Sequence, residues 1–262
     1  MLSDNDIDRY LQRIGVDRAD VTIDLDGLSM LQHAHLTTVP FTNLDVYDRL
    51  PVRTGLDWSI PAVINGRGGW CFVLNGAFDA LLTSLGFEVT RLGAIVLMAA
   101  ETSPMDDHLC LKVTLKDTTE WLVDVGFGES FTRPMRLNSD EPIDDIAAGR
   151  RYRLNSYGDG LRQLESEQSA PNGTADWRVD YRFSDEPCDL GYFDAANEYL
   201  RSTVGLMWTA KRFSTRLTEF GRVTLLHDRI RHSPVGGEFL DTDLANDDAW
   251  EAARRRHLPS QS

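Results

Sequence analysis

Residues 108–126 read His-Leu-Cys-Leu-Lys-Val-Thr-Leu-Lys-Asp-Thr-Thr-Glu-Trp-Leu-Val-Asp-Val-Gly. Apolar side chains stand at every second position from Leu109 to Leu115 and again from Trp121 to Val125. A period of two is typical of β-strands, and Asp117 to Glu120 between the two runs are turn-forming residues. The stretch therefore predicts an antiparallel hairpin.

The chain before this hairpin has the period of helices instead. Apolar residues recur three and four positions apart over 7–14, 25–39 and 72–85, which predicts three helices. Gly15 and Gly86 end the first and third, and Pro40 ends the second because proline has no backbone N–H to donate. Between the second and third we expect mainly loops.

The chain after the hairpin mixes both periods. Residues 176–183 alternate as a strand, and we expect a helix over 193–200, a strand over 222–226 and a last helix over 243–257. The order helical, then β-rich, then mixed predicts an α+β protein whose parts pack on one another.

Composition excludes several classes of function. The chain has 262 residues with 27 basic and 41 acidic side chains, a net charge of −14. Such a surface repels nucleic acid, and the one basic patch in the sequence is Arg254 to Arg256. There is no apolar run long enough to span a membrane, so we expect neither a nucleic-acid nor a membrane partner.

The cysteines and the first residues indicate the compartment. Three scattered cysteines, Cys71, Cys110 and Cys188, do not form a disulfide framework. The first residues are acidic and lack the pattern of a secretory signal. We expect a reduced, cytoplasmic protein.

One cysteine stands in an unusual context, Arg67-Gly68-Gly69-Trp70-Cys71-Phe72. Two glycines let the backbone turn sharply, and a helix beginning at Cys71 would direct free N–H groups and a positive dipole at the sulfur. These favour a thiolate and could stabilise an oxyanion. The alternative is a cysteine that merely fills the core.

A cysteine nucleophile needs a base and a group that orients it. Of the six histidines, His33 and His35 end a helix and suit capping or packing, while His227, His232 and His257 suit solvated positions. His108 opens the strand described above, and Asp124 lies between two valines, where a buried acid needs a partner. A hydrogen bond to a nearby turn is the alternative for Asp124.

Spacing alone leaves this assignment open. A turn centred on Thr118 pairs Asp124 with Lys112, so a bulge or curl would be needed to bring His108 to Asp124. A metal site made of Cys71, His108 and Cys110 is a further alternative, but it lacks the close ligand pairs of structural zinc, and we expect no metal.

The motifs themselves resemble those of arylamine N-acetyltransferases. The similar segments are Arg67 to Asn75, His108 before an alternating strand, Asp124-Val125-Gly126-Phe127-Gly128, and Val39-Pro40-Phe41-Thr42-Asn43-Leu44. The resemblance covers residues 1–135 well and the remainder weakly.

The resemblance implies an N-terminal helical bundle over 1–86, a central antiparallel β-barrel over 87–189 and a C-terminal α/β lid over 190–262. It implies a papain-like triad of Cys71, His108 and Asp124. Cys71 would take an acetyl group from acetyl-CoA and pass it to an aromatic amine or hydrazine. No metal enters this reaction.

The resemblance also implies binding residues. Phe41, Phe127 and Trp208 would bind substrate, Gly126 and Gly128 would lie near the coenzyme A, and Arg67 and Asn75 would support the site. Two alternatives stay open: an amide synthase of the same fold that releases a polyketide thioester, with an acyl carrier protein as a possible partner, and a non-catalytic protein that kept the fold.

Three segments depart from the family's pattern. Thr42 and Val73 stand where the family usually has Glu, so Arg67 lacks its usual partners. Apolar residues in Thr203 to Trp208 replace polar ones expected to hold coenzyme A, and would suit a longer acyl chain. The family's usual Phe-Gly ending is absent.

Overall fold

The computed structural model describes residues 1–97, 103–158, 160–169 and 175–258. Its first part is helical, and the three helices expected from the sequence are present. The elements are α1 Asp4–Ile14, η1 Arg18–Asp20, α2 Leu25–Thr38, α3 Leu44–Tyr47, α4 Leu56–Ile64 and α5 Cys71–Leu85. Gly15 and Gly86 end α1 and α5 with left-handed backbones, φ 73° and 104°.

The expectation of mainly loops between α2 and α5 was wrong. Helices α3 and α4 lie there, and α4 contains Pro61, the residue type that argues most strongly against a helix. Four apolar residues of α4 are buried against α1 and α5 (Ile60, Ala62, Val63 and Ile64). Tertiary packing therefore outweighs the local signal.

The middle of the chain forms an eight-stranded antiparallel sheet in the order β5-β4-β3-β2-β9-β8-β7-β6. Its strands are β2 Glu88–Val96, β3 His108–Thr114, β4 Glu120–Val123, β5 Met135–Arg136, β6 Ile143–Asp145, β7 Arg150–Ser156, β8 Leu161–Ser169 and β9 Ala175–Pro187. Side chains from both ends of this order, such as Met135 and Tyr152, share one buried cluster. The sheet therefore curls into a nearly closed barrel around its own core.

The predicted hairpin is β3–β4, but its register differs from the expectation by two residues. Leu111 pairs with Val123 and Lys112 with Leu122, so the continued register sets Asp124 opposite Cys110 rather than Lys112. His108 then lies two residues along the same face, within diagonal reach of Asp124. The expected bulge is not needed, and none is found between the described residues of β3 and β4.

The last part forms a second sheet, the lid sheet, in the order β1-β10-β11-β12-β13. Its strands are β1 Phe41–Thr42, β10 Ser214–Thr218, β11 Gly221–Leu225, β12 Arg229–Pro234 and β13 Leu240–Asp243. The helical elements here are η2 Leu190–Phe193, α6 Asp194–Ser202, α7 Met207–Ala210 and α8 Asp247–His257. The last helix was expected from Asp243, but Asp243 ends β13 and Asn246 caps α8.

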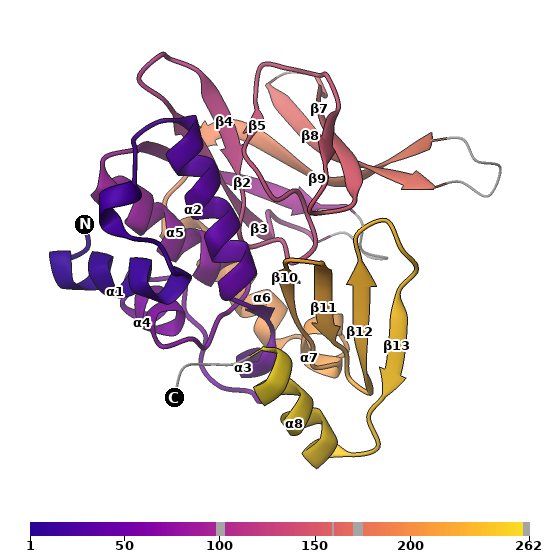
Figure 1. The fold of residues 1–262 in the computed structure, drawn as a ribbon. Helices are drawn as coiled ribbons and strands as arrows, with labels where there is room; N and C mark the ends of the chain where they lie inside the picture. The colour runs from indigo at the N-terminus through magenta and orange to yellow at the C-terminus, as the bar shows by residue number, and fades with distance from the viewer. Residues whose placement is uncertain (98–102, 159, 170–174, 259–262) are drawn as a thin grey trace.

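These parts pack closely, as Figure 1 shows, with the helices against one side of the barrel and the lid sheet beside both. Strand β3 joins two cores, since Leu109 and Leu111 pack among the helices while Cys110 faces the barrel interior. The α+β prediction is confirmed. None of the described helices is both long and apolar enough to cross a bilayer.

Candidate active site

Cys71 is the first residue of α5, one residue before the start expected from the helical period. In the turn before it, Gly68 has a left-handed backbone with φ +75°. The turn is held to β1 by a hydrogen bond from Thr42 N to Gly69 O at 2.9 Å. The first N–H groups of a helix have no partner within it, and its dipole is positive there. Cys71 lies at this positive end because it begins the helix. It is 7% exposed and therefore largely shielded from water.

His108 pairs with Asp124 next to Cys71. His108 Nε2 lies 2.7 Å from Asp124 Oδ2, and the two residues are 2% and 1% exposed. Cys71 Sγ hydrogen-bonds to Asp107 O, the carbonyl just before His108, at 3.6 Å. Burial lowers the pKa of His108, but the Asp124 carboxylate and then the Cys71 sulfur outweigh it and raise that pKa to about 10. The ring is therefore protonated at neutral pH.

The Asp124 carboxylate is saturated with donors. Besides His108 it accepts Tyr181 Oη–H at 3.2 Å on Oδ2, and Asn75 Nδ2 and Gly126 N at 2.8 Å each on Oδ1. Two carboxylate oxygens have about four acceptor sites, so each is used. A buried charge is stable only when satisfied in this way, and Asp124 is thereby fixed in position.

The residue that holds Asp124 lies one turn beyond Cys71 on α5. Asn75 Oδ1 also accepts Val125 N at 2.9 Å, and its Nδ2 donates to Leu109 O at 2.5 Å. A Cβ on Gly126 would lie 2.8 Å from Cys71 Cα, closer than real Cβ contacts. The helix that carries the sulfur and the loop that carries the carboxylate therefore pack backbone against backbone.

Comparison with known proteins agrees with this arrangement. A sequence profile described as N-acetyltransferase matches residues 24–258. Human arylamine N-acetyltransferase 1 is 30% identical over 246 residues, which cover 87% of this chain and 84% of that protein. The chain belongs to the arylamine N-acetyltransferase family.

Two further proteins are similar to this chain, one in sequence and one in fold. Proansamycin X synthase of Amycolatopsis mediterranei is 31% identical over 262 residues, 97% of this chain and 96% of that protein. The arylamine N-acetyltransferase structure from Salmonella typhimurium has a TM-score of 0.88 at 22% identity, covering 100% of this chain and 93% of that one. The resemblance read from the motifs is confirmed, and the protein is an acyltransferase rather than a non-catalytic relative.

In this arylamine N-acetyltransferase family member, aromatic rings surround the three residues. The Phe127 ring lies 5.2 Å from the His108 ring. Trp208 lies 6.1 Å from Phe41 and 6.0 Å from Trp70, the residue before Cys71. The structure thus brings Phe41 and Trp208 together beside Trp70 and places Phe127 at the histidine.

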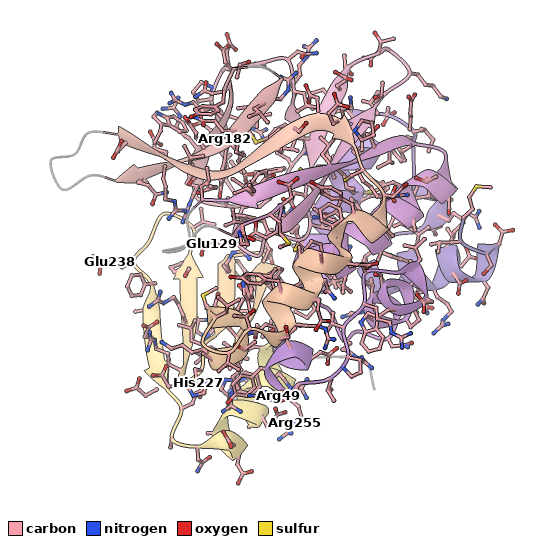
Figure 2. The ribbon with its side chains drawn as sticks, turned by 180° about the vertical axis from the view of Figure 1, so that it is seen from behind. Arg49, Glu129, Arg182, His227, Glu238 and Arg255 are labelled. Carbon is pink, nitrogen blue, oxygen red and sulfur yellow. The ribbon has the colours of Figure 1, made fainter. Side chains whose placement is uncertain are left out.

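The Gly126–Gly128 loop is anchored from the lid sheet. Gly128 has φ +87°, and a Cβ there would lie 3.1 Å from the Phe41 ring. Arg222 of β11 donates to Gly128 O. Glu129, seen in Figure 2 where the barrel meets the lid sheet, pairs with Arg150 at 2.8 Å. These contacts fix the loop that follows Asp124.

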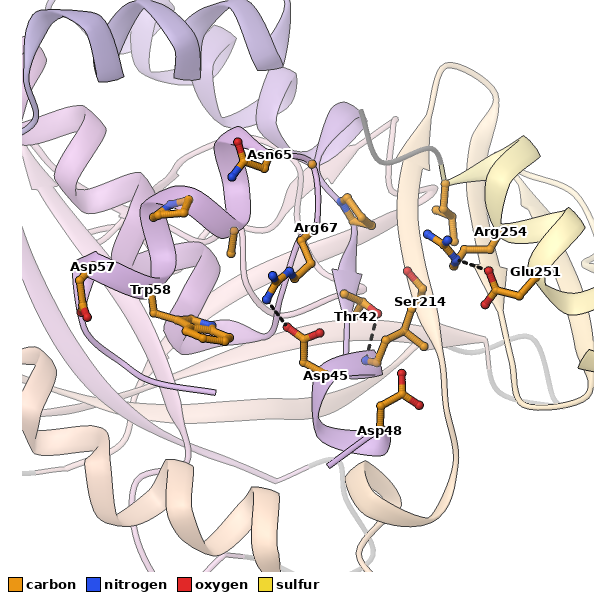
Figure 3. A pocket seen from close by; sticks show the side chains of 16 residues that line it. Thr42, Asp45, Asp48, Asp57, Trp58, Asn65, Arg67, Ser214, Glu251 and Arg254 are labelled. Carbon is orange, nitrogen blue, oxygen red and sulfur yellow. Dashed lines mark hydrogen bonds and ion pairs between the residues drawn. The ribbon is translucent and has the colours of Figure 1, made fainter. Parts of the chain in front are cut away.

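Arg67 has taken a new partner. It lies 3.2 Å from Asp45 and 5.3 Å from the Trp58 ring, with its side chain 52% exposed. Figure 3 shows it inside a cavity of about 540 Å³ between α4, α3 and α8. Thr42, which stands where the family usually has a glutamate partner for Arg67, also lines this cavity. Its hydroxyl donates to Phe213 O. Cys71, His108 and Asp124 do not line it, so the cavity lies behind the turn rather than at the sulfur.

The structure also shows the surroundings of His35 and bears on the metal site considered from the sequence. His35 is fully buried, with Tyr10 Oη 3.0 Å from its Nδ1, and so belongs to the core. Among the described residues no group of three or more His, Cys, Asp or Glu could hold a metal. Tyr181 and Gln32, which contact Asp124, were missed by the sequence analysis. Tyr181 stands in an alternating strand, but no pattern shows what its hydroxyl will meet.

Proposed function

We propose that this protein transfers an acyl group from a thioester to an aromatic amine or hydrazine through an acyl intermediate on Cys71. The observation that carries the proposal is the buried His108–Asp124 pair, 2.7 Å apart, beside Cys71 at the start of α5, whose sulfur bonds to the carbonyl just before His108. We also propose that the chain divides into a helical domain over 1–86 that carries Cys71, a β-barrel domain over 87–189 that carries His108 and Asp124, and an α/β lid over 190–262.

The first half-reaction forms the intermediate. The Cys71 thiolate, paired with the His108 imidazolium, attacks the thioester carbonyl carbon, and a soft sulfur nucleophile suits this acceptor. The bond from carbonyl carbon to donor sulfur breaks, and the leaving thiolate takes the proton from His108. Backbone N–H groups at the start of α5 are available to the oxyanion. The products are acyl-Cys71, neutral His108 and free thiol.

The second half-reaction restores the starting state. An aromatic amine is largely unprotonated near neutral pH and attacks the carbonyl carbon of acyl-Cys71. His108 accepts the proton of the amine nitrogen while the bond to Cys71 Sγ breaks. The Asp124 carboxylate stabilises the imidazolium that forms again.

The proposal extends to the acyl donor and to the residues that bind the donor and the acceptor amine. Family membership supports acetyl-CoA as the donor, with Gly126 and Gly128 beside it. The position of Phe127 against His108 supports an acceptor ring at that place, bounded by Phe41 and Trp208. All three cysteines are free thiols, which suits a reducing, cytoplasmic location.

Intact-mass measurement after incubation with acetyl-CoA tests the proposal. We expect one acetyl group on the wild-type chain, lost when an arylamine is added, and none on Cys71→Ser. Cys188→Ser is the matched control, since Cys188 is a partly exposed thiol outside this arrangement. Acetylation that persists in Cys71→Ser, or a wild-type chain that stays unmodified, would overturn acetyl transfer through Cys71.

A second candidate is an amide synthase that uses a longer acyl thioester, with an acyl carrier protein as its partner. Two observations favour it: the end-to-end match with proansamycin X synthase, and the exposed apolar side chains of Val204 and Met207 beside Trp208, 80% and 56% exposed. Long-chain acyl thioesters in the same mass measurement decide between the two. Modification by these alone would favour the amide synthase.

A further inference from the structure

The short helix α7, which carries Trp208, has little to hold it in place. It is a single turn, Met207–Ala210, without a buried residue. Its backbone makes few internal bonds, among them Ala210 N to Leu206 O and Lys211 N to Met207 O. Helix propagation therefore contributes little to its position, and its local side-chain support is the bond from Thr209 Oγ1 to Thr203 O at 2.8 Å and the packing of the Trp208 ring.

The missing support comes from the first part of the chain. Asn43, 1% exposed, donates both Nδ2 hydrogens to carbonyls of this segment, Trp208 O at 2.9 Å and Lys211 O at 2.8 Å. Its Oδ1 accepts Phe213 N at 2.8 Å. The last carbonyls of a helix need partners from outside, so Asn43 caps α7 from another part of the fold. Figure 1 shows α3, which Asn43 precedes, lying beside α7.

The position of α7 sets the position of the Trp208 ring. That ring lies 5.6 Å from Phe213, which the same amide holds, and also contacts Phe41 and Trp70. Phe41 in turn touches Gly128, and Trp70 precedes Cys71. A displacement of α7 would therefore move the aromatic rings packed against Trp70, the residue before Cys71, without changing Cys71, His108 or Asp124 themselves.

We propose that Asn43 is a positioning residue that sets the size of acceptor this enzyme takes, by fixing Trp208. The inference rests on the proposed acyl transfer to aromatic amines. A rigid Trp208 limits the space for fused-ring amines, while acylation of Cys71 by a small acyl thioester does not depend on it.

The test compares acceptors rather than total activity. For the wild type and Asn43→Ala, kcat/KM is measured with a single-ring and a fused-ring arylamine, and Cys71 acetylation is followed separately by mass. We expect acetylation to be kept and the ratio of fused-ring to single-ring kcat/KM to rise about tenfold. Asn43→Asp, which has the same shape but lacks the donor hydrogens, should shift the ratio in the same direction.

Asn197→Ala is the matched control. Asn197 is also a buried amide linking the lid to the first part, through Val52 O at 2.9 Å, but it does not hold α7. It should lower stability and leave the acceptor ratio unchanged. An equal shift in Asn197→Ala, or an unchanged ratio in both Asn43 variants, would overturn the role of Asn43.

A double-mutant cycle with Trp208→Phe shows whether the effect passes through the ring. If Asn43 acts by fixing Trp208, its substitution adds little to the acceptor ratio once the ring is changed. Additive effects would contradict the proposal. A wild-type chain that acetylates Cys71 but fails to acylate any arylamine would overturn the proposed function and this role with it.

Discussion

Asn75 Nδ2 donates to Asp124 Oδ1 at 2.8 Å, from the helix that begins at Cys71. Together with Val125 N, which donates to Asn75 Oδ1 at 2.9 Å, this hydrogen bond connects the helix that carries the sulfur to the loop that carries the acid. Both side chains are almost completely buried, 0% and 1% exposed. The relative position of Cys71 and Asp124 therefore depends on one amide rather than on the connecting chain.

Replacing Asn75 by alanine should weaken both the fold and the reaction. Val125 N and Leu109 O lose their amide partners in the core, which costs about 2–4 kcal/mol of unfolding free energy. We also expect kcat/KM to fall by about tenfold to a hundredfold as the site loosens. Urea unfolding and initial rates measure the two effects. Asn65→Ala, at an exposed helix end, should change neither; a stable, fully active Asn75→Ala would contradict this role.

Asp124→Asn keeps the shape of the side chain and removes its charge. The pKa of His108 should then fall, because the carboxylate that raises it is gone. We expect kcat/KM to drop by about 10³–10⁴-fold, with slower alkylation of Cys71 at pH 7. Asp145→Asn is the control, since Asp145 is another buried, hydrogen-bonded acid, located away from Cys71. Comparable activity in the two variants would argue against a role for the Asp124 carboxylate in the reaction.

Much of this site could be predicted from the sequence because its parts carry local signals. The start of α5 follows to within one residue from the glycine turn and the helical period, and Asp124 stands out as an acid between valines. The contact of His108 with Asp124 could not be derived, since it depends on a hairpin register that shifts by two residues from a symmetric turn.

Contacts between distant segments had no local signal at all. Tyr181 and Asn43 meet their partners across 57 and 165 residues. Helix α4 was missed because it contains Pro61, a residue that usually ends a helix. The buried face of α4 nevertheless stabilises it against the neighbouring helices. The partner of Arg67, Asp45, likewise lies 22 residues away along the chain, and no local pattern connects the two.

Arg67→Ala should be tolerated better than its place in the motif implies. The ion pair with Asp45 is half exposed, and such pairs contribute about 0–1 kcal/mol. Gly69→Ala in the same turn should cost more, about 1–3 kcal/mol, because its Cβ would lie 2.6 Å from Val73 Cγ1. Urea midpoints of the two variants check the order, and a larger loss in Arg67→Ala would show that the arginine holds the turn.

Stability should fall in mild acid because of His35. Burial, aided by the charge of Arg13, lowers the pKa of His35 from 6.5 to about 3. Between these values the unfolded chain binds a proton that the folded chain does not, so the free energy of unfolding decreases as the pH falls below 6.5. From pH 7 to pH 5 the loss attributable to His35 is about 2 kcal/mol. His35→Gln should remove this part of the pH dependence in urea titrations, whereas His33→Gln, at an exposed position of the same helix, should keep it. An unchanged slope in His35→Gln would mean that other groups cause the acid sensitivity.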